Sequence, residues 1–298
     1  MEKDYQLRGK LRNNIPLSGY TTWRVGGPAD RIYQPADLQD LANFIAGLPV
    51  TEPLLWIGLG SNLLIRDGGF RGTVIAFYGA LAESELLSAT RVQIGAGLSC
   101  ARLARFLSRH KLTGGEFFSG IPGTIGGALA TNAGAFGGQT WELVTEVTTM
   151  DRQGQLHQRT PADYQISYRE IRLKNNCPEE WFVAACLQFQ PATDDFGTER
   201  IRVLLNQRAQ TQPIGKASAG STFRNPPGDY AGRLIEASGL KGFCIGGACV
   251  SEIHANFIIN TGNAQAADIE NLIQHIQERV IKLHGVQLIP EVHIVGVG

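Results

Sequence analysis

Short apolar runs, separated by glycine and polar turns, mark the first part of the chain. Runs rich in branched and aromatic residues predict strands at 31–34, 54–57 and 74–77, and the polar-start segment 36–46 predicts a helix between the first two. Another run predicts a strand at 91–94. Strands that alternate with a helix indicate a small α/β unit.

An amphipathic helix is predicted after Ser99, because a serine oxygen can accept a hydrogen bond from a free amide at a helix start. Gly114 and Gly115 are expected to end this helix. Its apolar stripe contains Leu103, Phe106, Leu107 and His110.

The second half of the chain shows strands first and helices later. After the strands, the pattern predicts a turn-rich boundary at 191–197, then a helix, a loop, a second helix ending at Gly239, a strand, and a long helix that stops at Gly285. The strands are expected at 143–150, 155–159, 182–190 and 256–259, the first and last helices at 199–210 and 264–284, and the loop at 211–229.

A length of 298 residues allows two domains, and we divide the chain into 1–195, with a subdivision near 78, and 196–298. The 27 Lys and Arg residues balance the 27 Asp and Glu residues, and 43% of the chain is hydrophobic. This composition excludes a disordered chain and argues against a nucleic-acid or membrane-surface binder. Any bound anion must therefore be held locally.

The five cysteines show no Cys-x-x-Cys pair and no zinc-like spacing, so we expect neither structural disulfides nor zinc, and we interpret Cys244 and Cys249 as buried small residues. The start of the chain has no apolar run after its charges, so no signal peptide is expected. The uncharged stretch 117–141 contains too much glycine for a membrane helix and is interpreted as loop. These features indicate a cytoplasmic protein.

Glycine is unusually frequent, with 36 residues, and two glycine-rich segments are candidate cofactor cradles. The first, starting at Gly58, reads GLGSNLL, but Leu63 replaces the third glycine of a dinucleotide fingerprint, which disfavours a Rossmann site. The second, starting at Ser119, contains no Lys or Arg. Both could hold a diphosphate through exposed backbone amides, or could simply form tight turns.

The chain resembles a known flavoenzyme family, the UDP-N-acetylenolpyruvoylglucosamine reductases. Seven motifs occur in the family's order over nearly the whole chain: GLGSNLL, IGAGLS, SGIPGTIGGALATNAGAFGG, ISYREI, SAGSTFRNP, GFCIGGACVSEIHANFIIN and LIPEVHIVG. The resemblance implies an α+β fold, in which an FAD-binding domain of the vanillyl-alcohol-oxidase type, built from two α/β subdomains, precedes a smaller α/β substrate-binding domain.

The same resemblance implies an activity. It is the reduction of UDP-N-acetylglucosamine enolpyruvate to UDP-N-acetylmuramate by NADPH through FAD, in peptidoglycan synthesis, on which cell shape and cell division depend. The FAD-binding residues that it implies are Thr22, Arg24, Gly58, Gly60, Ser61, Asn62, Leu63, Gly120, Ile121, Pro122, Gly123, Thr124, Gly126, Gly127, Asn132, Ala133, Gly134 and Ala135.

Hydride addition to an enolpyruvyl ether leaves a carbanion conjugated with the carboxylate, so the site needs a cation for that carboxylate and an acid for the carbon. Arg169 resembles the family's arginine that steadies the enolate, because its planar fork suits a carboxylate. Taken alone, a surface arginine paired with Glu170 is the commoner case. Ser221 resembles the family's proton donor, although a Ser after Gly is otherwise usually a turn or a cap.

Glu291 resembles the family's carboxylate, which works with Arg169 and shares or supplies the proton. We place it in an apolar strand near the end of the chain, where a carboxylate must be paired or protonated. Either Ser221 or Glu291 can deliver the proton on this basis.

The resemblance also implies that Tyr168, Arg224 and Asn225 lie on the substrate side, with Arg224 near the uridine diphosphate. The short spacing between Arg169 and Ser221 indicates that the chain resembles the family's shorter subclass. Ile253 stands where a Lys or Arg is often found, which leaves open how the diphosphate is neutralised there. We expect a monomer without nucleic-acid or membrane partners.

The other polar residues receive structural interpretations. No histidines pair at metal-ligand spacing, so we predict no metal site. One row of basic residues at helical spacing is interpreted as a solvated helix face: Arg102, Arg105 and Arg109.

Two alternative functions stay open at this point. One is a different flavoprotein on the same fold, such as an oxidase of small alcohols, which would have no reason to keep Arg169, Ser221 and Glu291 together. The other is a sensor of nucleotide sugars that has lost its chemistry. Consumption of NADPH that depends on the enolpyruvyl substrate would separate these hypotheses.

Overall fold

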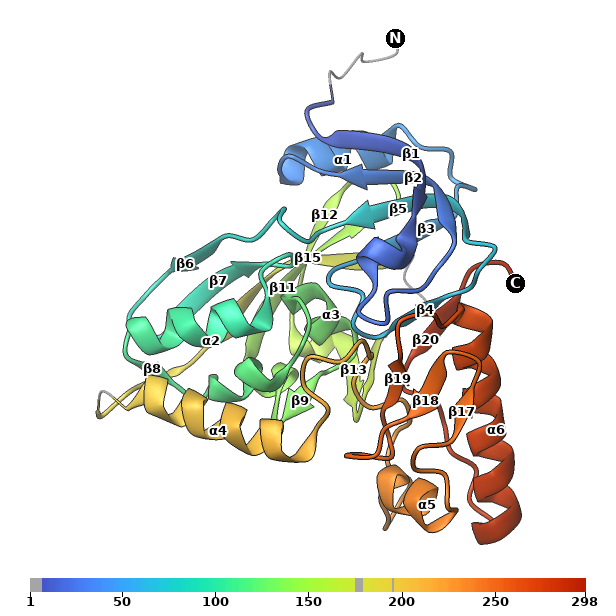
Figure 1. Cartoon of the computed structure of the whole chain (residues 1–298). Helices are drawn as coiled ribbons and strands as arrows, with labels where there is room; N and C mark the ends of the chain where they lie inside the picture. The colour runs from blue at the N-terminus through green and yellow to red at the C-terminus, as the bar shows by residue number, and fades with distance from the viewer. Residues whose placement is uncertain (1–6, 175–178, 195) are drawn as a thin grey trace. The chain divides into compact units, whose positions relative to one another are not determined.

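The computed structural model describes residues 7–174, 179–194 and 196–298 (Figure 1). Contacts divide the chain into two compact units. The first contains the described residues up to Arg12, together with Arg31–Gly58 and Thr73–Asn206. The second contains Asn13–Asp30, Leu59–Gly72 and Gln207–Gly298.

These units interleave in the sequence, which differs from the predicted single division near 195. The chain passes from one unit to the other inside three strands, β1 (Lys10–Pro16), β2 (Pro28–Gln34) and β5 (Phe70–Ala76), and again inside the helix α4 (Gly197–Thr211). A single cut in the sequence cannot describe such an arrangement. The assignment of 1–195 to FAD binding and 196–298 to substrate binding stays a prediction.

The first unit is built on an antiparallel five-stranded sheet. Its central pair, β11 and β15, is register-shifted between Val144 and Glu146 and again between Thr148 and Thr149. In spatial order the strands are β12 (Leu156–Arg159), β11 (Val144–Asp151), β15 (Glu180–Gln188), β7 (Arg91–Gly95) and β6 (Ser84–Leu86). The strands predicted at 91–94, 143–150, 155–159 and 182–190 are therefore confirmed to within a few residues.

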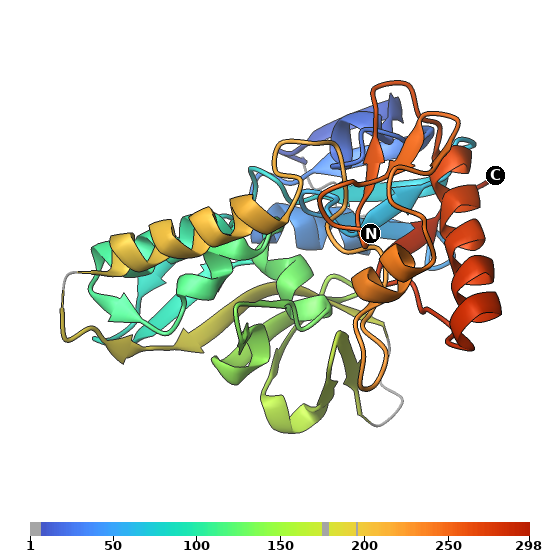
Figure 2. The same cartoon turned by 60° about the horizontal axis from the view of Figure 1, so that its bottom comes forward.

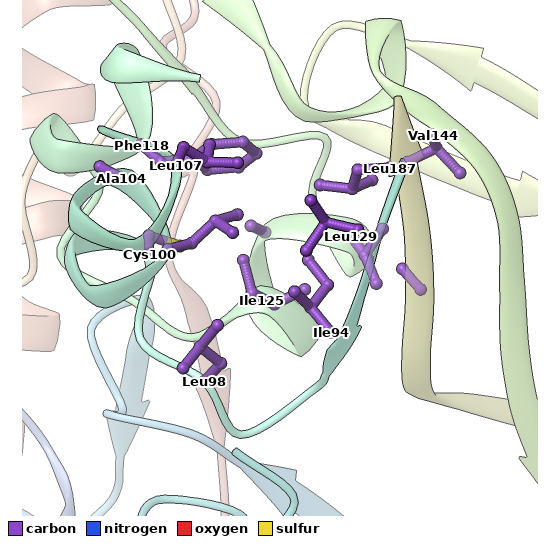
Figure 3. Packing of buried hydrophobic residues seen from close by; sticks show 14 of the residues in the cluster. Ile94, Leu98, Cys100, Ala104, Leu107, Phe118, Ile125, Leu129, Val144 and Leu187 are labelled. Carbon is purple, nitrogen blue, oxygen red and sulfur yellow. The ribbon is translucent and has the colours of Figure 1, made fainter. Parts of the chain in front are cut away.

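The helix α2 (Cys100–Arg109) contributes its apolar stripe to the main core of this unit (Figure 3). The side chain of Ser99 accepts a hydrogen bond from the amide of Arg102, which confirms the predicted N-cap. The helix ends before the predicted glycines, because His110 is its C-cap and Lys111 adopts a left-handed conformation with φ of 54°. Leu103 and Leu107 are fully buried among residues of the sheet and the glycine-rich segment.

The interpretation of the stretch 117–141 as loop is wrong. This stretch contains the 3-10 helices η2 (Glu116–Gly120) and η3 (Thr140–Glu142), the helix α3 (Ile125–Ala130), and the short strands β9 (Gly134–Ala135) and β10 (Gly138–Gln139). The apolar spacing of Ile125, Ala128 and Leu129 buries one side of α3 in the core, and this burial outweighs the low helix propensity of two glycines.

A second sheet has the strand order β1-β2-β5-β3, with β3 (Leu54–Ile57) parallel to β5. The helix α1 (Leu38–Ala46) begins at Asp37, whose side chain accepts a hydrogen bond from the amide of Asp40. This confirms the predicted early α/β unit. Smaller elements are η1 (Leu17–Tyr20), η4 (Pro161–Asp163), and the paired strands β8 (Leu112–Thr113) and β16 (Gln190–Pro191).

The second unit combines a small antiparallel sheet with two helices. The sheet contains β17 (Cys244–Ile245), β18 (Ala248–Val250) and β19 (Ile258–Asn260), and the helices are α5 (Ala231–Ala237) and α6 (Ala266–His284). The long helix ends at Gly285 with φ of 67°, as predicted. Its first two amides donate to the carboxylate of Asp67. Trp23 and Leu64, far away in sequence, are fully buried in the core that α5 and α6 share.

The prediction that cysteine pairs would be absent is wrong. Cys244 and Cys249 form a disulfide across the β17–β18 hairpin, where the two residues are direct partners in the register. Cys244 is exposed rather than buried. Sequence spacing missed the pair because the four residues between the cysteines form a tight hairpin, which only the folded register reveals.

No helix in the described ranges is long and apolar enough to cross a membrane. Within the same residues, no group of three or more His, Cys, Asp or Glu side chains could hold a metal ion.

Candidate active site

In the first unit, Arg169 lies in a tight two-residue turn. The strands β13 (Tyr164–Ser167) and β14 (Glu170–Leu173) pair antiparallel, with Ser167 opposite Glu170. Arg169 adopts a left-handed conformation with φ of 58°, which costs a non-glycine residue about 1–2 kcal/mol. The turn therefore holds Arg169 in a conformation that the residue itself does not favour.

The guanidinium of Arg169 connects this hairpin to the glycine-rich segment. Its Nη1 donates to the carbonyl of Asn132 over 3.4 Å, and its Nη2 donates to the carbonyl of Gly134 over 3.3 Å. Its carbon Cζ also lies 5.3 Å from the ring centroid of the exposed Tyr168. Glu170, the neighbour considered as a partner of Arg169, forms an ion pair with Arg172, with 2.6 Å between Glu170 Oε1 and Arg172 Nη2. The unit thus brings two predicted FAD residues and Arg169 together.

Asn132 holds this arrangement from inside. It is 4% exposed and has a positive φ of 42°. Its Nδ2 donates to the carbonyl of Ser167 at 3.2 Å and to Oε1 of Gln139 at 2.9 Å, while its Oδ1 accepts from the amide of Trp141 at 3.1 Å. The buried amide is therefore a bridge between the glycine-rich segment and the hairpin of Arg169.

Two backbone amides at the start of α3 donate hydrogen bonds within the protein, although the sequence suggested that they would be exposed. The amide of Ile125 donates to Leu98, and that of Gly126 donates to Ala96. These amides are satisfied by the protein, so the expectation of exposed amides is wrong for them. A Cβ at Gly126 would lie 3.0 Å from the Cβ of Ala96, whereas a Cβ at Gly127 would meet no atom within 4 Å. Packing therefore explains Gly126, while Gly127 leaves an open backbone that a ligand can approach.

In the second unit, the loop after β3 packs against the segment around Thr22. Gly60 has a φ of 60°, and a Cβ there would lie 2.0 Å from the carbonyl oxygen of Tyr20, so only glycine fits. The amide of Thr22 donates to the carbonyl of Gly60 at 3.3 Å. Two predicted FAD segments are thus neighbours, although Arg24 in the same loop is exposed.

Two buried threonine hydroxyls test whether these segments suit FAD. Thr124 Oγ1 in the first unit and Thr22 Oγ1 in the second have no hydrogen-bond partner among the described residues. A buried polar group without a partner costs about 1–3 kcal/mol, and a ligand rich in phosphate and hydroxyl oxygens removes that cost. Gly58 allows the close approach to Thr124, because a Cβ at Gly58 would lie 2.2 Å from Thr124 Oγ1. The residues present therefore fit FAD.

In the second unit, a short backbone ladder joins the segment after Ser221 to the segment that contains Glu291. The amide of Glu291 donates to the carbonyl of Thr222 at 2.8 Å, and the amide of Arg224 donates to that of Ile289 at 2.9 Å. Both Ser221 and Glu291 are half-buried. Segments far apart in sequence are thus paired, and Glu291 lies opposite Thr222, the residue that follows Ser221.

Asn62 also holds the segment that contains Glu291, through two hydrogen bonds. Its Nδ2 donates to the carbonyl of Glu291 at 3.2 Å, and its own carbonyl accepts from the amide of His293 at 3.0 Å. The strand β4 (Leu63–Ile65) pairs in parallel with β20 (His293–Val295), which sets this register. Glu291 was expected inside a strand, but it precedes β20, because the extended backbone around it pairs with Thr222 and Asn62 instead of a full neighbouring strand.

The predicted substrate contacts have mixed environments. Asn225 Oδ1 accepts from the amide of Ala231 at 3.1 Å and so supports the start of α5. Ile253 is 56% exposed and offers no charge to a diphosphate.

Asn256 is a residue of this site that the sequence did not single out. It is 3% exposed, its Oδ1 accepts from the amide of Phe223 at 3.0 Å, and its Nδ2 donates to the carbonyl of Phe223 at 2.8 Å. Its carbonyl accepts from the amide of Thr222 at 2.8 Å. The only available signal was a lone amide between apolar neighbours in the HANF sequence. Asn256 therefore holds the segment that follows Ser221.

His254 supports Asn256 in a way that depends on pH. The amide of Asn256 donates to His254 Nδ1 at 3.2 Å, which requires that nitrogen to be unprotonated. Burial, and then the charge of Lys241, lower the pKa of His254 below its usual range.

We expect acidification to destabilise the protein through His254. The native state binds a proton less readily than the unfolded chain, so this contribution is complete above the unfolded pKa of about 6.5 and is lost as the pH falls from there towards the lower native pKa. The free energy of unfolding, measured with urea between pH 7.5 and pH 5, should fall less steeply in His254→Gln than in the parent. The exposed His110→Gln serves as control, and equal slopes for His254→Gln and the parent would contradict the assignment.

Two family models match the chain. The model described as FAD binding domain matches residues 29–159, and the C-terminal domain of UDP-N-acetylenolpyruvoylglucosamine reductase matches residues 212–295.

Full-length relatives carry the same description. The UDP-N-acetylenolpyruvoylglucosamine reductase of Nitrosococcus oceani is 56% identical over 291 residues, covering 97% of this chain and 96% of its own. That of Alkalilimnicola ehrlichii is 55% identical over 288 residues, covering 97% and 95%. The crystal structure of the Thermus caldophilus reductase superimposes with a TM-score of 0.80 at 30% identity, covering 97% of this chain and 99% of that one.

Proposed function

The chain belongs to the UDP-N-acetylenolpyruvoylglucosamine reductase family, and we propose that it reduces UDP-N-acetylglucosamine enolpyruvate to UDP-N-acetylmuramate with NADPH as the reductant and FAD as the bound cofactor. This reaction belongs to peptidoglycan precursor synthesis. The observation that carries the proposal is the ladder that pairs Glu291 with Thr222, the residue after Ser221, and ties Glu291 to Asn62.

When bound, FAD would supply hydride-transfer chemistry between NADPH and the vinyl carbon of the substrate. The segments that would hold FAD are those around Thr22, Gly58–Leu63, Gly120–Gly127 and Asn132–Ala135. The buried hydroxyls of Thr22 and Thr124 and the open backbone at Gly127 support this assignment.

Arg169 stabilises the negative charge that develops on the substrate carboxylate. A guanidinium presents two parallel N–H groups to a carboxylate, and this bidentate contact is stronger than the contact of a single ammonium group. The carbonyls of Asn132 and Gly134 and the ring of Tyr168 restrict the side chain before substrate arrives. Preorganised charge of this kind needs little rearrangement during the reaction.

Ser221 donates a proton to the substrate carbon that bears the carboxylate. The carbanion is basic enough to take a proton from a hydroxyl that is positioned against it. Glu291, on the neighbouring segment, works with Arg169 at the carboxylate and is the alternative proton source. Tyr168, Arg224 and Asn225 contact the substrate, with Arg224 near its diphosphate.

Both NADPH and nucleotide sugars are cytoplasmic metabolites, so we place the enzyme in the cytoplasm, acting as a monomer. Its product is a precursor of the wall that determines cell shape and division.

We expect purified, FAD-loaded protein to oxidise NADPH over many turnovers only when the enolpyruvyl substrate is present. An oxidase of small alcohols would instead consume oxygen with alcohols, and a nucleotide-sugar sensor would bind the substrate without consuming NADPH. The loss of NADPH absorbance, measured with UDP-N-acetylglucosamine as the control, separates the proposed function from both alternatives, and oxygen consumption with alcohols identifies an oxidase. Equal NADPH consumption with and without substrate would reject the proposal.

Ser221→Ala should leave the reductive half-reaction intact and lower turnover by at least about a hundredfold, the contribution typical of general acid catalysis. NADPH should still bleach the flavin at the parent rate, because that step needs no proton on substrate carbon. Stopped-flow absorbance follows the two half-reactions separately. Ser218→Ala in the same loop is the matched control. Near-normal turnover of Ser221→Ala would contradict the role of Ser221 and assign proton donation to Glu291.

Arg169→Lys should lower kcat by about tenfold to a thousandfold, because an ammonium cannot reproduce the two-pronged contact. The control is Arg172→Lys in the same hairpin, which only alters an exposed ion pair with Glu170. Steady-state kinetics of the FAD-saturated proteins provide the comparison. If Arg169→Lys and Arg172→Lys had equal kcat values, Arg169 would have no part in the reaction.

A further inference from the structure

A cavity lies between two helices of the first unit, α2 and the N-terminal part of α4. The helices run alongside each other in both views (Figures 1 and 2), and the cavity has a volume of about 890 Å³. This volume lies in the upper part of the range found for small-molecule sites, about 300–1,000 Å³. None of the residues predicted to bind FAD or to act in catalysis lines it.

The two helices touch where the end of α2 meets the start of α4, at residues that also line the cavity. The hydroxyls of Ser108, near the end of α2, and Thr198, near the start of α4, lie 2.9 Å apart. A Cβ at Gly197 would lie 3.0 Å from Ser108 Oγ, so the backbones are close there. One turn further, Ile201 is still buried in the core, but Leu205 is 41% exposed at the wall of the cavity.

The charge at this cavity is one-sided. Four arginines line it, and no acidic residue does; the four are Arg102, Arg105, Arg109 and Arg202. Only Arg202 has an ion pair, with Glu199 at 2.7 Å, whereas the other three have none within the part of the chain that the structure describes. Arginines elsewhere are commonly paired, as Arg66 is with Glu270 and Arg159 with Glu180.

Such a concentration of unpaired positive charge is notable in a protein with a net charge of zero. Like charges repel, so a cluster without counter-charges costs stability that an anionic ligand would recover. Arg102 and Arg109 are seven residues apart on α2, which is about 10 Å along a helix. The row is therefore long enough to contact more than one oxygen-bearing group of a ligand.

The remaining wall is apolar and aromatic. Leu98, Phe106 and Ile201 line the cavity beside the guanidinium groups. A guanidinium fork matches phosphate oxygens in bidentate contact, whereas an apolar wall gains free energy by burying the body of a ligand. A simple solvated helix face would need neither the cavity nor the apolar wall.

We propose that this cavity binds a small organic phosphate, a mono- or diphosphate ester with an aromatic or apolar body. The phosphate lies on Arg102, Arg105 and Arg109, and the body lies against Phe106 and the apolar wall. The site is separate from the proposed catalytic function and does not depend on it. The three arginines are exposed, as expected for a solvated helix face, and the proposal adds a binding role to that face.

The test uses the FAD-loaded protein with 1-naphthyl phosphate as the probe. Fluorescence titration measures the dissociation constant. We expect the triple variant Arg102→Gln, Arg105→Gln, Arg109→Gln to bind at least tenfold more weakly than the parent. The matched control removes three other exposed positive charges through Arg71→Gln, Arg279→Gln and Lys282→Gln, and should bind within twofold of the parent.

Two analogues test the two halves of the recognition. Uncharged 1-naphthol and inorganic phosphate should each bind at least tenfold more weakly than the probe, and probe affinity should fall as salt is raised. Equal binding by the triple variant and the parent, or equal weakening in the control, would overturn the proposal, as would naphthol binding as tightly as the probe. Flavin content and thermal unfolding verify the fold of each variant, and Arg105→Gln alone, expected to weaken binding at least threefold, replaces the triple variant if that variant fails to fold.

Discussion

The parallel pairing of β20 with β4 is the constraint on which the candidate site of the second unit depends. It brings the end of the chain onto the strand after Asn62, so that the amide of this side chain reaches the carbonyl of Glu291. The amide of Glu291 also donates to the carbonyl of Thr222, the residue that follows Ser221. Because these are mainly backbone contacts, they set the positions of the side chains without using the side chains themselves.

Buried asparagines perform a similar task in both units. Asn132 bridges the glycine-rich segment and the hairpin of Arg169, and Asn256 holds both backbone groups of Phe223. An amide has donors and an acceptor in one plane, so it can replace a missing neighbouring strand. Loss of such a side chain would leave buried backbone groups without partners, which is more costly than the loss of one exposed hydrogen bond.

Three strained backbone positions lie near the proposed chemistry of the first unit. Asn132, Phe136 and Arg169 all have positive φ values although none is glycine. Each such residue costs free energy, and the hydrogen bonds of Asn132 and Arg169 to their neighbours offset part of it. The strained turns aim Arg169 along the segment expected to contact FAD, which is consistent with a preorganised cation.

The sequence by itself determined the kinds of elements and the candidate residues. Regular periodicity predicted strands such as 54–57 and 91–94. Ser99 predicted the start of one helix and Gly285 the end of another. These signals could be interpreted from the sequence because they depend on neighbouring residues only. Ordered motifs predicted the family and its chemistry. Only the tertiary structure revealed the interleaved units, the helix inside the glycine-rich stretch, the Cys244–Cys249 pair, the role of Asn256 and the cavity lined by the arginine row. Each of these depends on contacts between segments that are separated along the chain or on a register set by folding, and local propensity contains no information about such contacts.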